Sequence, residues 1–126
     1  MASYEDLVVW QKAHALAISV YGLAKHLPPD ERYAIWDQLR RAAVSVPANI
    51  AEGSGTGSDG LMSRHLAIAG GSLAEVRYLL LLARDLGYLP ADTYQSAAEL
   101  ASEVSRILTS FCKRVEERVA KPSRKG

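Results

Sequence analysis

The sequence predicts an all-α protein folded as an up-down-up-down four-helix bundle. In four long segments, apolar residues recur every three or four positions, which is the spacing of one helix face. The segments keep a seven-residue register, and Pro or Gly marks the short connections between them. Long helices with short connections pack as antiparallel neighbours. At 126 residues the chain is one domain, and we expect a bundle over residues 1–120 and a basic disordered tail at 121–126.

The first periodic segment predicts a helix that begins near Ser3 and ends before the Pro28-Pro29 pair. Its apolar seam consists of Val9, Ala13, Leu16, Val20, Leu23 and Leu27. A second stripe runs beside the seam through Trp10, His14 and Tyr21, so only a narrow strip of this helix is polar.

The second segment predicts a helix that opens at Asp30, which is a good N-cap residue. Its seam consists of Ile35, Leu39, Ala42, Val46 and Ile50. Pro47 interrupts the segment and lacks a backbone donor, but Ile50 keeps the phase, so we expect a kinked continuation. Gly53 is expected to end the helix, and residues 53–60 read as a glycine-rich loop with Ser58 or Asp59 capping the next helix.

The third and fourth segments are the most regular. The third has the seam Met62, Leu66, Ala69, Leu73, Val76, Leu80 and Ala83. Gly87 is expected to end this helix, and Pro90 to start the next. The fourth helix should run from about Ala91 to Val119, with the seam Tyr94, Ala97, Ala101, Val104, Leu108, Phe111 and Val115.

The apolar stripes of the first helix and of the second half of the third are wider than a lone bundle needs. A bundle helix requires apolar residues at about three positions in seven. The excess predicts a homo-oligomer, because a large exposed apolar patch marks an interaction surface. Two mid-helix glycines support this, since each costs about 1 kcal/mol relative to Ala and fits best where another backbone approaches. The expected interface residues are Trp10, Tyr21, Gly70, Gly71, Leu79 and Leu82. The alternative is a broad intramolecular core with the glycines marking a bend.

Composition indicates a cytoplasmic protein that does not enter a membrane. The longest uninterrupted apolar stretch is residues 78–83, which is far short of the ~20 residues that cross a bilayer. The N-terminus lacks the basic and apolar regions of a signal peptide. A single cysteine, Cys112, excludes an internal disulfide and a cysteine-based zinc site.

The sequence contains no constellation that predicts catalysis, a metal or a cofactor. His14, His26 and His65 lack a carboxylate or second histidine at ligand spacing, so a non-enzymatic protein without a metal is expected. Cys112 borders the fourth seam and reads as a packing residue. The glycine-rich loop lacks the preceding strand and the Gly-Lys-Ser/Thr ending of phosphate-binding loops.

Two basic groups are candidates for contact with RNA or DNA, although the net charge is only +1. Residues 113–126 hold six basic and two acidic residues, a net charge of +4. The second helix carries the adjacent pair Arg40 and Arg41, of which Arg40 should pair with Asp37. The candidate contact residues are Arg40, Arg41, Lys113, Arg114 and Arg118. The alternatives are a structural Arg-carboxylate pair and a solvated helix end.

Several blocks of the chain also resemble a known family. They are YEDLVVWQKA at 4–13, QLRRAAVSVPANIAEG at 38–53, IAGGSLAE at 68–75 and LGYL at 86–89. This pattern is similar to the small four-helix-bundle proteins encoded by intervening sequences in bacterial large-subunit ribosomal RNA genes, a family that includes accessory proteins of diversity-generating retroelements. The resemblance covers the chain from Tyr4 to about Val119.

The resemblance implies a cytoplasmic bundle that assembles as a ring-like homopentamer. For the retroelement branch it implies a basic surface that binds nucleic acid and a reverse transcriptase as partner. Arg40 and Arg41 match the family's paired arginines, and Asn49 and Glu52 match its kinked-helix signature. The chain departs from the family at Gly55-Thr56, where Gly-Arg is common, and the lost charge weakens the nucleic-acid interpretation. Two functions therefore stand: a nucleic-acid-binding oligomer and a structural or protein-interaction scaffold.

Overall fold

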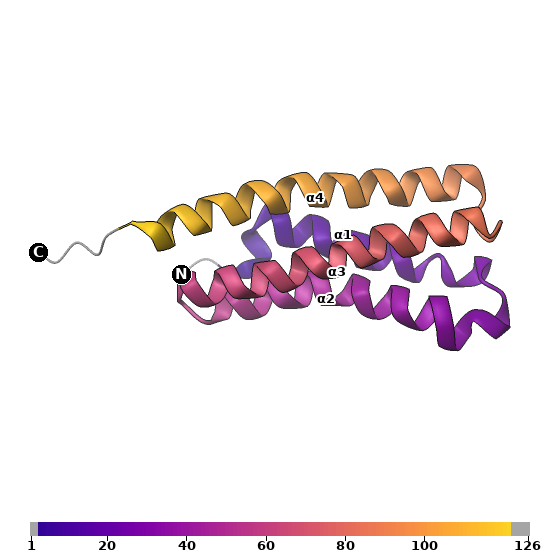
Figure 1. The fold of residues 1–126 in the computed structure, drawn as a ribbon, viewed down its shortest axis with the longest axis horizontal. Coiled ribbons are helices and arrows are strands. Elements are labelled where there is room, and N and C mark those ends of the chain that lie inside the picture. The colour runs from indigo at the N-terminus through magenta and orange to yellow at the C-terminus, as the bar shows by residue number, and fades with distance from the viewer. Residues whose placement is uncertain (1–2, 122–126) are drawn as a thin grey trace, which may run out of the picture.

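The computed structural model describes residues 3–121 and confirms the all-α four-helix bundle (Figure 1). The helices are α1 (Val8–Tyr21), α2 (Asp37–Gly55), α3 (Asp59–Asp85) and α4 (Ala91–Ala120). Residues 3–121 are 87% helical and contain no strand. The short tail predicted at 121–126 lies outside the described residues except for Lys121.

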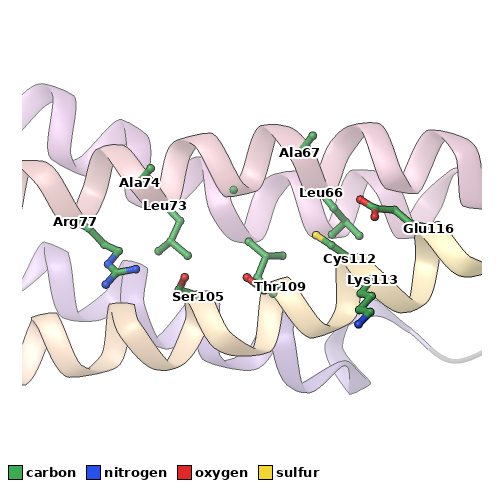
Figure 2. Close-up of a pocket in the computed structure, with 12 residues that line it drawn as sticks. Leu66, Ala67, Leu73, Ala74, Arg77, Ser105, Thr109, Cys112, Lys113 and Glu116 are labelled. Carbon is green, nitrogen blue, oxygen red and sulfur yellow. The ribbon is translucent and has the colours of Figure 1, made fainter.

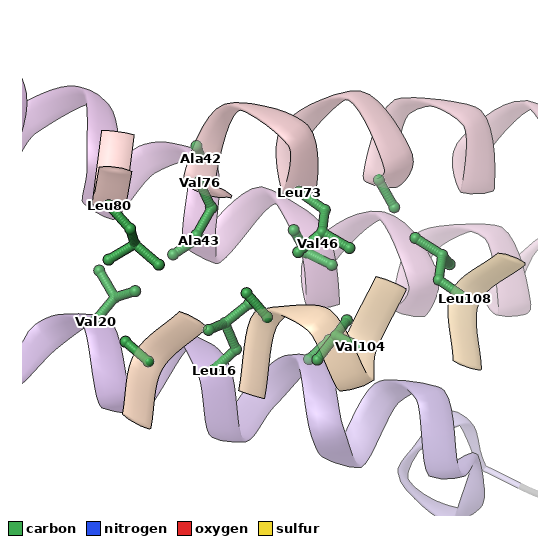
Figure 3. Close-up of a cluster of buried hydrophobic side chains, with 14 of the residues drawn as sticks. Leu16, Val20, Ala42, Ala43, Val46, Leu73, Val76, Leu80, Val104 and Leu108 are labelled. Atoms are coloured by element: carbon green, nitrogen blue, oxygen red, sulfur yellow. The ribbon is translucent and has the colours of Figure 1, made fainter. Parts of the chain in front are cut away.

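Each helix packs against two neighbours in chain order, α1 on α2, α2 on α3, α3 on α4 and α4 on α1. The four seams predicted from the sequence meet along the axis of the bundle. One fully buried residue from each helix illustrates this core: Leu16, Val46, Val76 and Val104 (Figure 3). Burying such a side chain contributes about 1.5–3 kcal/mol each, so the continuous seams are the main source of stability.

The first predicted helix is divided into shorter pieces. A 3-10 turn at Tyr4–Asp6, capped by the Ser3 hydroxyl, precedes α1, which ends at Tyr21 rather than near Pro28. Another 3-10 turn, Ala24–His26, follows Gly22. The apolar periodicity of the first segment therefore continues beyond the α-helix itself, because these short turns still bury Leu23 in the core.

The entry into α2 differs from the prediction. Asp30 does not cap the helix: it lies inside a 3-10 turn, Pro29–Glu31, and a π-helical turn, Arg32–Trp36, follows. The expectation at Pro47 is met in that the helix continues through it, and α2 runs on past Gly53 to Gly55. The expected loop at 53–60 is therefore only residues 56–58, and Ser58 caps α3 by accepting a bond from the Leu61 amide.

The turn between α3 and α4 ends the third helix as predicted. Gly87 has a φ of +81°, the left-handed conformation that favours glycine. The Tyr88 amide then donates to the Ala83 carbonyl at 2.9 Å, which satisfies one of the open carbonyls of the helix end. The Tyr88 hydroxyl donates to the Glu31 carboxylate at 3.2 Å and joins this turn to the segment before α2.

The α3 helix is long and apolar enough, by length and composition, to cross a membrane. Length and composition do not by themselves identify a membrane span, because a core helix of a bundle meets the same criteria. Its packing explains the apolar width, since α3 lies against both α2 and α4. Leu79 is only 4% exposed, so the prediction that it enlarges an exposed patch is wrong. Leu82 is half-buried and also packs against the core.

Candidate functional site

The paired arginines of α2 share one carboxylate. Arg40 forms a hydrogen-bonded ion pair with Asp37, as the sequence predicts, and Arg41 Nε lies 3.2 Å from the other oxygen of the same carboxylate. The Arg41 side chain is 72% exposed and that of Arg40 37%. Ion pairs this exposed contribute only about 0–1 kcal/mol, but they cancel part of the positive potential.

The basic residues of α4 lie at the other end of the bundle. Arg40 is near the start of α2 and Arg118 near the end of α4, and these two helices run in the same direction (Figure 1). Arg118 is itself held by Asp59, with both contacts at 3.2 Å. Arg114 lies over the Phe111 ring at 5.7 Å. The five cations predicted to bind nucleic acid therefore do not form one continuous surface on a single chain.

The family-signature residues of α2 form a polar ladder against α3. Asn49 donates its amide to the Ser45 carbonyl at 2.9 Å and to the Ser45 hydroxyl at 3.0 Å. Its amide oxygen lies 3.1 Å from His65 Nδ1, which is also 3.7 Å from the Glu52 carboxylate. The Ser45 hydroxyl bonds to that of Ser72 at 2.8 Å. The ladder, Ser72–Ser45–Asn49–His65–Glu52, thus joins the two helices by the side-chain hydrogen bonds Ser45–Ser72 and Asn49–His65, with Glu52 near the His65 ring.

Gly53 lies at the end of this ladder, where α2 and α3 are tightly packed. A Cβ at this position would lie 2.6 Å from Met62 Sδ and 2.9 Å from His65 Cβ, distances that real contacts do not show. The glycine is therefore required by packing rather than by a turn, and α2 can pass through it without stopping. Together with the ladder, this contact indicates a structural role for the signature block. Within residues 3–121 no three His, Cys, Asp or Glu side chains group as a metal site.

A row of partly exposed aromatic and apolar side chains follows α1 and the segment before α2, and we call it the aromatic edge. Its members are Tyr4, Trp10, His14, Ile18, Tyr21, Tyr33 and Trp36. Trp10 stacks on His14 with ring centroids 4.8 Å apart, and Tyr21 meets Trp36 edge-on at 5.7 Å. Tyr33 is 88% exposed and Tyr21 51%. The edge contains the two aromatic residues that the sequence assigns to an interface, Trp10 and Tyr21.

A groove of about 410 Å³ lies between α3 and α4 (Figure 2). Small side chains form its walls, and Gly70 and Cys112 are among them. Burial and then the nearby Glu116 carboxylate raise the pKa of the Cys112 thiol, so the thiol stays protonated and behaves as an apolar group. Gly71 is exposed and does not line the groove, so the two predicted interface glycines face different surroundings.

Sequence reasoning missed Tyr33 and the groove. Tyr33 lies outside the apolar seam of its segment, which begins at Ile35. It is exposed on the π-helical turn, for which the sequence gives no signal. The sequence signal for the groove is a row of small residues at helical spacing in the third segment, such as Ala67, Gly70 and Ala74. Such spacing shows that the residues share a face, but not whether another helix covers it.

Comparison with known proteins gives two findings. Residues 5–110 match the family described as 23S rRNA-intervening sequence protein. The fold is similar to a solved protein of unknown function from the S23 ribosomal protein family of Bacteroides thetaiotaomicron VPI-5482, with 27% identity and a TM-score of 0.78. This similarity covers 84% of the present chain and 99% of the other. Comparison with curated proteins gives no match.

Proposed function

The chain belongs to the 23S rRNA-intervening sequence protein family, and from this premise we propose that it is a non-enzymatic scaffold that self-assembles through the aromatic edge. Five subunits is the number that the family resemblance implies. The observation that carries the proposal is the edge itself, in which Tyr33 is 88% exposed and Tyr21 51%. Aromatic residues are enriched at interfaces because they bury large area with few rotatable bonds.

The chemistry of the edge supports this assignment. Ile18 is 62% exposed and lies one helical turn from both His14 and Tyr21, so the exposed apolar surface is continuous along α1. Trp36 extends it to the segment that enters α2, because its ring meets that of Tyr21, and the exposed Tyr33 lies in the same π-helical turn as Trp36. In water such a row is unfavourable by roughly 25 cal/mol for each Å² of apolar area left uncovered. A second subunit that covered it would remove this cost.

The assembly mass tests the proposal. We expect the wild-type chain to elute as an oligomer in gel filtration with light scattering, and the double variant Tyr21→Ser/Tyr33→Ser to approach the monomer mass. Tyr78→Ser is the matched control, because Tyr78 is 59% exposed on α3, away from the edge, and its loss should leave the mass unchanged. Circular dichroism checks that each variant is folded. A monomeric wild-type chain at micromolar concentration would refute self-assembly.

The end of α4 favours a second candidate function, contact with RNA or DNA. Lys113 and Arg114 are exposed and form no ion pair with any residue in 3–121, unlike Arg40 and Arg41. An assembly repeats these cations, which would raise local attraction for phosphates.

Salt-dependent fluorescence anisotropy with a labelled structured RNA tests this second function. The double variant Lys113→Ala/Arg114→Ala should weaken binding to RNA of any sequence. It should also reduce the slope of log K against log salt concentration by about two, since each phosphate contact contributes about 0.9 to that slope. Arg40→Ala/Arg41→Ala is the control and should have a smaller effect, because Asp37 already holds both side chains. Undetectable binding of the wild-type chain at low salt would leave the scaffold function alone.

A further inference from the structure

The groove between α3 and α4 is long, shallow and apolar at its floor. Leu66, Leu73 and Leu108 form the floor. Its length from Leu66 to Arg77 on α3 is eleven residues, or roughly 16 Å at 1.5 Å per residue. This matches about three turns of a helix laid against it. Short side chains along both walls allow a third helix to approach closely.

Charged residues stand at the two ends of the groove. Figure 2 shows Arg77 at one end and Lys113 and Glu116 at the other. Neither Arg77 nor Lys113 forms an ion pair with a residue that the structure describes. Two cations against one carboxylate give the rim a positive balance over an apolar floor, which favours an occupant with carboxylates beside an apolar stripe.

We propose that this groove binds an acidic amphipathic helix of a partner protein. The occupant is a helix because both walls are α-helices whose backbone groups bond within themselves. An extended peptide would find no free backbone donors or acceptors there and would leave much of its own backbone unpaired. A helix satisfies its backbone internally and presents residues i, i+3, i+4 and i+7 to the floor.

A second copy of this chain is the alternative occupant. The segment before α2, which carries part of the aromatic edge, holds Lys25 and Arg32 against Asp30 and Glu31, so it offers no excess of carboxylates. A partner helix with carboxylates beside its apolar stripe therefore matches the positive rim better.

Gly70 lines the groove, and the fold leaves room for a side chain at this position. A Cβ at Gly70 would meet nothing within 4 Å, so the fold does not require glycine there. Mid-helix glycine costs about 1 kcal/mol relative to Ala, and a closely seated helix would account for the absence of a side chain. The same openness makes Gly70 a position where a larger residue can fill the groove without disturbing the bundle.

The experiment measures binding of a designed peptide to the full chain by fluorescence anisotropy. The probe is a labelled peptide of roughly 15 residues, with Leu and Ala at i, i+3, i+4 and i+7 and Glu at the flanking positions, long enough to become helical on the groove. A second peptide has Lys in place of every Glu. We expect the acidic peptide to bind about tenfold or more tightly than the basic one, and Arg77→Gln/Lys113→Gln to remove that preference.

Gly70→Leu and Gly71→Leu form a matched pair of variants. Both add the same side chain at an open position of the same helix, but only Gly70 lines the groove. Gly70→Leu should weaken binding of the acidic peptide at least tenfold, while Gly71→Leu should leave the affinity for that peptide unchanged. Equal binding of the two peptides, absence of binding, or an unaffected Gly70→Leu variant would each overturn the proposal.

The oligomer mass of Gly70→Leu separates this inference from the proposed self-assembly. The mass should stay that of the wild-type chain if a foreign helix is the occupant. If the Gly70→Leu variant forms a smaller oligomer and the wild-type chain does not bind the peptide, a second copy fills the groove. That result would overturn the proposal while leaving self-assembly intact.

Discussion

The two seams of α3 differ in how tightly they are packed. Against α2, the helices are joined by the polar ladder, and a Cβ at Gly53 would collide with Met62 at 2.6 Å. Against α4, the helices leave a groove of about 410 Å³, and a Cβ at Gly70 would meet nothing within 4 Å. The first glycine is explained within the chain, and the second is not. The α2–α3 seam is therefore closed within the chain, whereas the α3–α4 seam leaves space for a further side chain.

Replacing Gly53 should cause the largest loss of stability. We expect Gly53→Ala to lower the free energy of unfolding by about 1–3 kcal/mol, the usual cost of forcing a group into a packed seam. Chemical denaturation monitored by circular dichroism measures this. Gly55→Ala is the control, because a Cβ at Gly55 meets nothing within 4 Å, and it should be neutral or stabilising. Equal effects of the two changes would mean that the α2–α3 seam is not tight.

Removing Asn49 should cost less. Asn49→Ala takes away three side-chain hydrogen bonds, to the Ser45 carbonyl, the Ser45 hydroxyl and His65. We expect a loss of about 1 kcal/mol or somewhat more, since half-buried polar partners recover part of their bonding from water. Gln38→Ala removes an exposed amide from the same helix and should have little effect. A neutral Asn49→Ala variant would exclude a structural role for this signature residue.

Replacing Gly70 should have the smallest effect, and in the opposite direction. Gly70→Ala is expected to raise the free energy of unfolding by about 0.5–1 kcal/mol, because alanine has less backbone freedom to lose on folding and fills open space. A thermal scan of the dilute protein measures the gain. Destabilisation by Gly70→Ala would show that the α3–α4 seam closes in solution, and the contrast between the seams would then fail.

The fold could be predicted from the sequence because the apolar seams are strictly periodic. The Leu66–Leu73–Leu80 row of α3 forms part of the core as predicted. Helix boundaries were harder, because tertiary packing overrides local signals there. Gly53 reads as a helix stop, yet α2 runs through it, and the missing side chain leaves room for Met62 and His65. The wide apolar stripe of α3 also predicts an exposed Leu79, which is in fact buried. Periodicity alone does not distinguish a residue buried by two neighbouring helices from an exposed one.

The candidate surfaces could be predicted only in part. Pairing of Arg40 with Asp37 follows from a three-residue helical spacing and is confirmed. Capture of Arg118 by Asp59 joins residues 59 positions apart, and no local pattern predicts it. The groove depends on how far α3 and α4 stand from each other, which is a property of packing and is absent from the sequence of either helix.

The π-helical turn at Arg32–Trp36 gives the chain a place to vary in length. A ring closed by i→i+5 bonds holds one residue more than an α-helical ring. Loss of one residue here could therefore be absorbed by conversion to ordinary α-helix, with the register of α2 in the core unchanged. The residues before the deletion, Tyr33 among them, would rotate about the helix axis by about 100°. A single-residue deletion at this point would remodel the aromatic edge while sparing the bundle.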